Sequence, residues 1–245
     1  MNKDKLIIAG PCAVENKLQL YNTFKAIHKY IDFFRAGIWK GRTSPKNYAG
    51  FGEKALPWIR DIQKKYRIPV AIEVGTTKHV ELALKYDVRQ IWIGARTTVN
   101  PFAVQELAEA LRNTEIAVWV KNPIISDIGL WTGAIERLER VGIKDIKTIY
   151  RGFHSEENTK YRNQPRWDLV ENFKHYYSNI PILFDPSHLS GDTKHISSLV
   201  KNTHKSINGF MFEVHNNPTK ALSDKEQQLD PEEFKLIIQK LGTNG

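Results

Sequence analysis

Residues 69–94 read PVAIEVGTTKHVELALKYDVRQIWIG, and this stretch contains one complete strand–helix–strand unit. Runs rich in strand-forming residues, at 69–74 and 90–93, bound it on both sides. Between them, residues 77–85 place apolar side chains at helical spacing. Because a helix joins the two predicted strands, we expect them to lie parallel in one sheet.

The same unit recurs along the whole chain. Strand-like runs begin near residues 6, 32, 69, 90, 116, 146, 181 and 209, and successive starts lie 21 to 37 residues apart. A helix is expected after each run, at about 17–30, 53–66, 77–85, 101–112, 131–142, 168–178, 193–205 and 231–241. Eight such units without a break in composition favour a single-domain α/β fold over residues 1–245, the (β/α)8 TIM barrel. An open doubly wound sheet is the alternative, although no G-x-G-x-x-G motif follows the first strand.

Cap residues mark several of the expected helix ends. Asn100-Pro101 and Asp230-Pro231 each join an N-cap residue to a first-turn proline, and Gly142 suits a helix C-terminus. Two expected connections are long, at about 36–52 and 151–167. Long connections in a compact domain are usually functional or mobile.

Composition and charge exclude several classes of protein. Of the 245 residues, 41% are hydrophobic and 26% are charged, which is ordinary for a globular chain. The single cysteine excludes an internal disulfide, and no stretch approaches the roughly 20 apolar residues of a membrane helix or resembles a signal peptide. We therefore expect a cytoplasmic protein that binds no membrane. The net charge of +9 favours anionic partners, but no nucleic-acid-binding motif is present.

Chemistry-bearing side chains follow every expected strand. In chain order they are Cys12, Arg35, Glu73, Arg96, Lys121, Arg151, Asp185 with His188, and Glu213. The carboxyl ends of the strands form the active-site face of a TIM barrel. These side chains are therefore expected to converge on one site.

One sector of this face carries donors that suit a metal. Barrel closure makes the last strand a neighbour of the first, so Cys12, His188 and Glu213 come from three consecutive strands, and Asp224 follows the last strand. A thiol, an imidazole and two carboxylates suit Mn, Fe, Co or Zn better than Mg or Ca. The alternatives are a buried, inert Cys12 or a lone thiol nucleophile, and a structural hydrogen-bonding role for His188.

The opposite sector is cationic, and Glu73 offsets only part of its charge. Its members follow the second, fourth, fifth and sixth strands: Arg35, Lys40, Arg42, Arg96, Lys121 and Arg151. Six cations around one cavity repel one another unless anions bind between them. A ligand with one phosphate and a carboxylate, or with two phosphates, is therefore expected. The alternative for Lys40 and Arg42 is that they are solvated loop residues.

Seven segments between residues 6 and about 241 match one family in order and spacing: IIAGPCAVE, FFRAGIWKGRTSP, WIGARTTVNPFAVQELA, VKNP, YRGF, DPSH and FEVHNNPTKALSDKEQQLDPEEF. They resemble 3-deoxy-D-arabino-heptulosonate 7-phosphate (DAHP) synthase, in particular the compact type I beta branch that is often fused to chorismate mutase. No mutase or regulatory domain is expected here. The resemblance also implies a homodimer or homotetramer, and regulation in trans by a separate chorismate mutase.

The resemblance implies a reaction and a role for each candidate residue. Phosphoenolpyruvate and erythrose 4-phosphate would condense with loss of phosphate, the first step of the shikimate pathway toward chorismate and the aromatic amino acids. The catalytic residues would be Lys121, His188 and Cys12. The divalent metal would be held by Cys12, His188, Glu213 and Asp224. Phosphoenolpyruvate would be held by Arg35, Arg96, Lys121 and Arg151, with Glu73 nearby, and the aldose phosphate by Lys40, Arg42 and Thr43.

Gly41 departs from the family pattern, in which this loop usually reads Lys-Pro-Arg-Thr. Glycine loosens a backbone that proline would fix, so a weaker sugar-phosphate site is expected. The sister 3-deoxy-octulosonate 8-phosphate synthase, which uses arabinose 5-phosphate, tends to have Lys-Ala-Asn-Arg here, whereas residues 40–43 read Lys-Gly-Arg-Thr. That enzyme and a non-catalytic phosphometabolite-binding barrel are the alternative functions.

Overall fold

A computed structural model of the chain describes residues 5–156 and 160–242. Eight parallel strands form a closed barrel in sequence order. They are β1 (Leu6–Gly10), β2 (Phe33–Arg35), β3 (Val70–Val74), β4 (Gln90–Ile93), β5 (Ala117–Lys121), β6 (Ile146–Tyr150), β7 (Ile182–Phe184) and β8 (Ile207–Glu213). The pairing of β8 with β1, from Gly209 opposite Leu6 to Glu213 opposite Gly10, closes the ring. The predicted TIM barrel is confirmed, and the open-sheet alternative is wrong.

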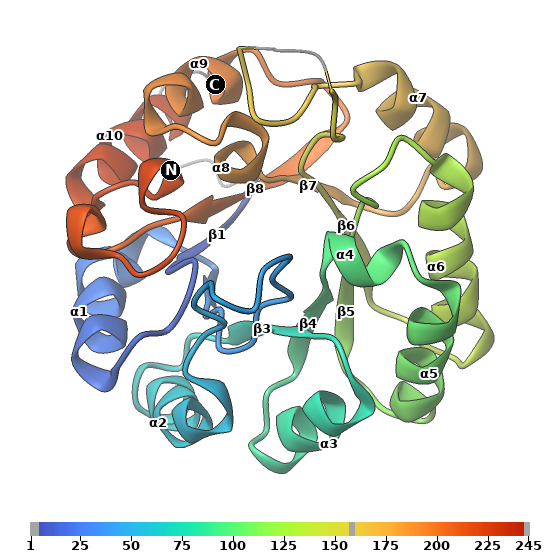
Figure 1. Cartoon of the computed structure of the whole chain (residues 1–245), viewed down its shortest axis with the longest axis horizontal. Helices are drawn as coiled ribbons and strands as arrows, with labels where there is room; N and C mark the ends of the chain where they lie inside the picture. The colour runs from blue at the N-terminus through green and yellow to red at the C-terminus, as the bar shows by residue number, and fades with distance from the viewer. Residues whose placement is uncertain (1–4, 157–159, 243–245) are drawn as a thin grey trace.

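Helices surround the strands on the outside of the barrel (Figure 1). The longer ones are α1 (Lys17–Ile27), α2 (Leu56–Tyr66), α3 (Thr77–Lys85), α5 (Pro101–Leu111), α6 (Ile128–Arg140), α7 (Trp167–Tyr176), α9 (Ile196–Lys201) and α10 (Pro231–Gly242). Two short helices that the sequence pattern does not predict, α4 (Ala95–Thr98) and α8 (Pro186–Ser190), follow β4 and β7. Short 3-10 helices occupy His28–Tyr30, Gly52–Ala55, Thr193–His195, Pro218–Lys220 and Lys225–Gln227.

Side-chain caps define several helix ends. The Asn100 carboxamide oxygen accepts hydrogen bonds from the first-turn N–H groups of α5, and the Asp230 carboxylate does the same for α10, as predicted. Gly142 has φ +89° just beyond α6, which fits its expected place after a helix. However, α6 begins three residues before the expected position, because Asp127 caps it by accepting from the Leu130 N–H.

Two apolar layers hold the barrel together. Its interior is filled by Ile8, Ala71, Trp92, Trp119, Ile149, Leu183 and Met211. The second layer lies between strands and helices, where Phe24 of α1 meets Phe34 of β2 edge-on at 5.1 Å between ring centroids. Since side chains fill the interior, ligands have room only above the strand ends.

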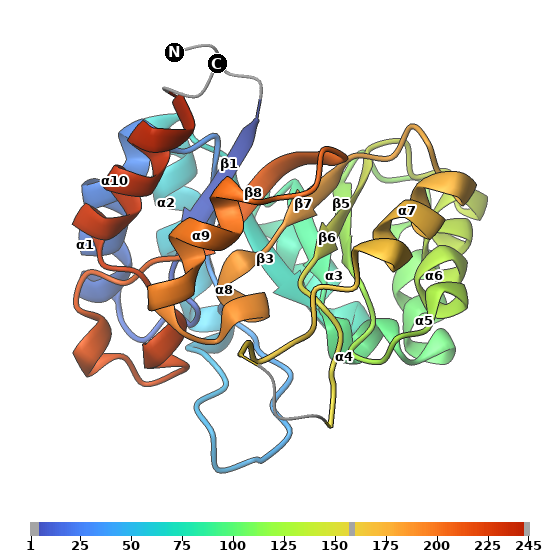
Figure 2. The same ribbon diagram turned by 90° about the horizontal axis from the view of Figure 1, so that it is seen from above.

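The two long connections project on the same side of the barrel. Figure 2 shows the blue segment after β2 and the yellow segment before α7 on the side where α4 and α8 lie. Both therefore border the carboxyl ends of the strands, as expected of functional connections. None of the helices formed by residues 5–156 and 160–242 is long and apolar enough to span a membrane.

Candidate active site

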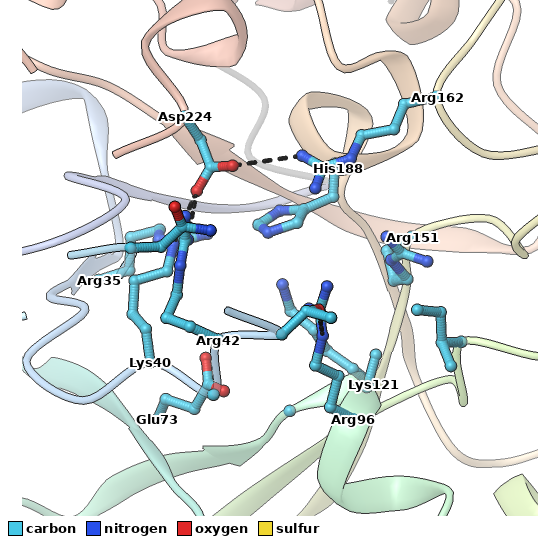
Figure 3. Close-up of a pocket in the computed structure, with 16 residues that line it drawn as sticks. Arg35, Lys40, Arg42, Glu73, Arg96, Lys121, Arg151, Arg162, His188 and Asp224 are labelled. Carbon is cyan, nitrogen blue, oxygen red and sulfur yellow. Dashed lines mark hydrogen bonds and ion pairs between the residues drawn. The ribbon is translucent and has the colours of Figure 1, made fainter. Parts of the chain in front are cut away.

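A cavity of about 230 Å³ opens at the carboxyl ends of the strands. Seven cationic side chains of the described chain line it: Arg35, Lys40, Arg42, Arg96, Lys121, Arg151 and Arg162. The carboxylates of Glu73 and Asp224 line it too. His188 lies between the side of the cavity that carries Lys40 and Arg42 and the side that carries Arg151 (Figure 3). Six of the seven cations are those predicted from the sequence. With seven positive charges against two negative ones, the lining favours an anionic ligand.

The four predicted metal ligands come together as two pairs. The Cys12 Sγ lies 3.2 Å from Asp224 Oδ2, and His188 Nε2 lies 3.7 Å from Glu213 Oε1. Cys12 follows β1, His188 lies in α8, Glu213 ends β8, and Asp224 belongs to the loop after β8. Within residues 5–156 and 160–242, no three His, Cys, Asp or Glu side chains already have the geometry of a metal site.

Cations lie among these four donors. Lys40 Nζ donates to Cys12 Sγ and lies 3.5 Å from Asp224 Oδ2, while Arg42 Nη1 approaches the same carboxylate oxygen to 2.8 Å. On the other side, Arg35 Nη2 donates to Glu213 Oε1 at 2.8 Å. Lys40 and Arg42, which the family resemblance assigns to the aldose phosphate, thus bind Asp224 in this structure. Their positive charges compensate the buried acidic groups.

The ionisation of Cys12 and Asp224 follows from these surroundings. Burial, and then the Glu213 charge, raises the pKa of the Cys12 thiol to about 12, so it is a thiol near neutral pH. Burial opposes ionisation of Asp224, but Lys40 and the hydrogen bonds from Arg42 and Ser223 hold its pKa well below its usual range. A metal would therefore displace a proton from Cys12 and the ammonium of Lys40 from Asp224.

Asp185 connects the imidazole of His188 to Lys121. Its Oδ1 accepts from the His188 backbone N–H at 2.9 Å, and its Oδ2 lies 2.9 Å from both His188 Nδ1 and Lys121 Nζ. Burial lowers the pKa of His188 to about 4, which leaves the imidazole neutral near pH 7. With Nδ1 facing Asp185, Nε2 is directed to Glu213 and its lone pair is available to a metal.

The cationic sector contains buried donors without acceptors. Arg35 is 1% exposed, and its Nε and Nη1 have no hydrogen-bond partner among the described residues. Arg151 forms no ion pair with any carboxylate in the described chain, and burial, followed by the Arg162 charge, lowers its pKa to about 10. Unpaired buried guanidinium N–H groups are costly. Arg151 already donates to Gly152 O and Asn163 Oδ1, so what it lacks is a countercharge, which a carboxylate or phosphate entering the cavity would supply.

Sequence reasoning missed several residues that hold this site in place. Trp92, inside the barrel, donates from Nε1 to Glu73 Oε2 at 3.0 Å, and its ring lies 5.2 Å from the Arg35 guanidinium. Asn122 accepts from the Arg151 backbone N–H at 2.8 Å. Arg162 belongs to one of the two long connections that were expected to be functional or mobile, so its region, though not the residue, could be predicted.

An aromatic stack anchors the loop that carries Lys40 and Arg42. The rings of Trp39 and His79 lie parallel, with centroids 4.0 Å apart and an interplanar angle of 2°. The Gly75 N–H donates to His79 Nδ1 at 3.2 Å, which requires that nitrogen to be unprotonated. The stack therefore joins the loop after β2 to the start of α3 through a neutral imidazole.

We expect this anchor to weaken in mild acid. Burial, and then the Lys78 charge, lowers the pKa of His79, so its neutral form favours folding above the unfolded value of about 6.5. That contribution is lost as pH falls below 6.5. Between pH 7.5 and 5.5 the Tm of wild type should therefore fall more than that of His79→Phe, which keeps an aromatic ring but cannot titrate. Equal falls in the two Tm values would contradict this role.

Comparison with known proteins identifies the family. The chain matches the DAHP synthetase I family over residues 2–244. It belongs to this family. The site thus occupies the strand ends of a DAHP synthetase I barrel.

Two relatives and a solved structure match nearly the whole chain. The phospho-2-dehydro-3-deoxyheptonate aldolase of Thermotoga maritima is 32% identical over 238 residues, which are 96% of this chain and 68% of that protein. A crystal structure of the Thermotoga maritima enzyme superposes with a TM-score of 0.86 at 30% identity, covering 98% of this chain and 69% of the other. The 2-dehydro-3-deoxyphosphooctonate aldolase of Wolinella succinogenes is 23% identical over 96% of this chain and 97% of its own.

Proposed function

We propose that this member of the DAHP synthetase I family condenses phosphoenolpyruvate with erythrose 4-phosphate and water to give DAHP and inorganic phosphate. The observation that carries the proposal is the set of unpartnered, buried guanidinium donors beside a thiol, an imidazole and two carboxylates. Membership of the family supports the same reaction, which opens the shikimate pathway. The chain is thus an enzyme of the transferase class.

Phosphoenolpyruvate fits the cationic sector. Its phosphate and carboxylate together offer the acceptors that Arg35 Nε and Nη1 lack and the countercharge that Arg151 lacks. Lys121, whose pKa burial lowers, and Arg96 would complete the ring of donors. Glu73, fixed by Trp92, would set one edge of this subsite. These groups hold the enol carbon toward His188 and Asp224.

The second sector fits a divalent metal. Its donors are the mixed set that Mn, Fe, Co or Zn accept, and the Lys40 ammonium already lies between the sulfur of Cys12 and the carboxylate of Asp224 as a stand-in cation. We propose Cys12, His188, Glu213 and Asp224 as the ligands. When bound, the metal would supply Lewis-acid polarisation of the aldehyde.

The residues of the chain would then orient the condensation. Arg42, Thr43 and a displaced Lys40 would bind the aldose phosphate and present its aldehyde carbon to the enol carbon of phosphoenolpyruvate. A bond forms between the enol methylene carbon and the aldehyde carbon. Water then adds at the carbon that carries the phosphate, and the bond between that carbon and the phosphate oxygen breaks as inorganic phosphate leaves. Lys121 Nζ, supported by Asp185 at 2.9 Å, is our proposed proton donor to the new hydroxyl.

Gly41 provides a test of the aldose loop. A side-chain carbon at this position would meet nothing within 4 Å, so substitution is sterically permitted. We expect Gly41→Pro, by restricting the free loop, to lower the KM for erythrose 4-phosphate about two- to fivefold without changing that for phosphoenolpyruvate. Gly41→Ala should give a smaller change in the same direction. A raised aldose KM in both variants would show that the loop depends on glycine.

An aldose panel tests the proposed function. Purified protein with Mn²⁺ and phosphoenolpyruvate is supplied with erythrose 4-phosphate or arabinose 5-phosphate, and enol loss and phosphate release are followed with and without a chelator. We expect chelator-sensitive turnover that prefers erythrose 4-phosphate. Preference for arabinose 5-phosphate would favour the octulosonate reaction of the more distant relatives. Phosphoenolpyruvate binding without turnover of either aldose would favour a non-catalytic barrel.

The proposal also covers the domain content, cellular location, oligomeric state and regulation of the enzyme. We propose a single catalytic domain of the beta branch, acting in the cytoplasm as a homodimer or homotetramer. We also propose that a separate chorismate mutase regulates the enzyme, in line with the resemblance to the branch that is often fused to one. Added mutase that changes neither turnover nor inhibitor sensitivity would contradict that regulation.

A further inference from the structure

One buried side chain joins the two sectors of the site. Asn163, from the connection between β6 and α7, is 3% exposed. Its Oδ1 accepts from Arg151 Nη1 at 2.9 Å, and its Nδ2 donates to the backbone oxygen of His188 at 2.7 Å. The carboxamide thus contacts a phosphoenolpyruvate-binding candidate at one end and the helix turn of a metal-ligand candidate at the other.

The backbone around Asn163 is fixed on both sides. The N–H groups of Arg162 and Asn163 donate to the carbonyl oxygens of Ser190 and Leu189, each at 3.0 Å. Arg162 Nη1 in turn donates to Gln227 Oε1 at 2.8 Å, in the loop that carries Asp224. Gly191 permits this approach, since a side-chain carbon there would lie 2.6 Å from the Arg162 Cβ. These contacts hold the Asn163 backbone in a fixed position against α8.

The two ends of the bridge need opposite hydrogen-bonding groups. Arg151 offers only donors, so its partner must accept, whereas the His188 carbonyl only accepts, so its partner must donate. Asparagine supplies both from one planar group. The Arg151 backbone is held separately, because its N–H donates to Asn122 Oδ1 at 2.8 Å. A bound anion would therefore act on the Arg151 guanidinium and, through it, on the Asn163 side chain.

We propose that Asn163 is a positioning residue that couples the two sectors, so that phosphoenolpyruvate and a divalent metal bind cooperatively. The inference rests on the proposed function, because it uses its two ligands. When Arg151 closes on an anion, the hydrogen bond to Asn163 fixes the turn of α8 that carries His188. The metal selects the same arrangement from the other side, and such coupling must be reciprocal.

Calorimetry of the whole protein tests the coupling. The Kd of phosphoenolpyruvate is measured without metal and with saturating Mn²⁺, and the Kd of Mn²⁺ without and with phosphoenolpyruvate. In wild type we expect each ligand to tighten the other about tenfold. In Asn163→Ala the factor should fall below about threefold, the remainder being direct attraction between anion and cation. Asn172→Ala, an exposed position on α7, is the matched control and should keep the wild-type factor.

Asn163→Asp separates positioning from simple packing. Aspartate has the same shape, but it neutralises Arg151 and cannot donate to the His188 carbonyl. We expect it to bind phosphoenolpyruvate about tenfold more weakly than Asn163→Ala does and to show no more coupling. A packing role would give the opposite order, with aspartate the milder change. A coupling factor in Asn163→Ala within twofold of wild type would overturn the inference and leave the proposed function intact, whereas a wild type that binds neither ligand would contradict both.

Discussion

Replacing Cys12 with serine should weaken divalent-metal binding and lower metal-dependent kcat together, each by about 100-fold or more. Mutation of residues that hydrogen-bond to metal ligands typically lowers metal affinity or activity about 10- to 100-fold, and loss of a ligand itself should cost at least as much. Serine keeps the volume and the fully buried position of Cys12, so the barrel should fold normally. Calorimetric titration with Mn²⁺ and Zn²⁺, beside turnover at saturating metal, measures both effects.

Ser223→Ala is the matched control for this variant. It removes the hydroxyl that lies 3.3 Å from Cys12 Sγ but leaves all four proposed ligands. Because the Ser223 hydroxyl also donates to Asp224 at 2.7 Å, we expect metal affinity in Ser223→Ala to fall about 10-fold, well short of the loss in Cys12→Ser. Full activity of Cys12→Ser in the presence of a chelator would exclude Cys12 as a ligand.

Replacing Arg151 with methionine should reduce kcat/KM for phosphoenolpyruvate about 100- to 1,000-fold and yet stabilise the ligand-free protein. The fall in kcat/KM is expected because the buried Arg151 guanidinium would form an ion pair with phosphoenolpyruvate. The gain arises because Arg151 is buried without a carboxylate partner in the described chain, and its lowered pKa of about 10 corresponds to a penalty of about 3 kcal/mol on the charged form. Methionine also leaves the buried Asn163 Oδ1 without its donor, which offsets part of this gain, so we expect the Tm to rise by only about 1–3 °C.

Arg166→Met provides the comparison for Arg151→Met. Arg166 lies in the same connection but is exposed and paired with Asp168 at 2.7 Å. Its loss should leave kcat/KM within about twofold and should not raise the Tm. If Arg151→Met lowered both kcat/KM and Tm, Arg151 would be a structural residue and not an anion receptor that lacks a countercharge.

Strand–helix periodicity was sufficient to predict the barrel. Each strand is a short apolar run whose neighbours along the chain are also its neighbours in the sheet, so local patterns determine the topology. The closing pair, β8 with β1, followed from the count of eight units. The short helices α4 and α8 escaped prediction because four or five residues cannot show helical periodicity.

Residue type and strand position together predicted most of the cavity lining. Both are local properties, since residues at or just after the carboxyl end of a strand lie at the open end of the barrel. The pairing of these side chains is not local: Lys40 could bind a phosphate or the Cys12–Asp224 pair, and only three-dimensional distances decide. Asn163 is a similar case, because nothing in its neighbourhood distinguishes it from a surface asparagine until its contacts with Arg151 and His188 are known.

The central claim is that one cavity holds the metal beside phosphoenolpyruvate. The most direct measurement is phosphorus NMR of phosphoenolpyruvate bound to the protein loaded with Mn²⁺, with Zn²⁺ as the diamagnetic reference. The account predicts strong paramagnetic broadening of the bound phosphorus signal, because two of the proposed metal ligands, His188 and Asp224, line the same 230 Å³ cavity as the cationic side chains. A phosphorus signal that stays as narrow with Mn²⁺ as with Zn²⁺, while both ligands are bound, would place the metal elsewhere and contradict the account.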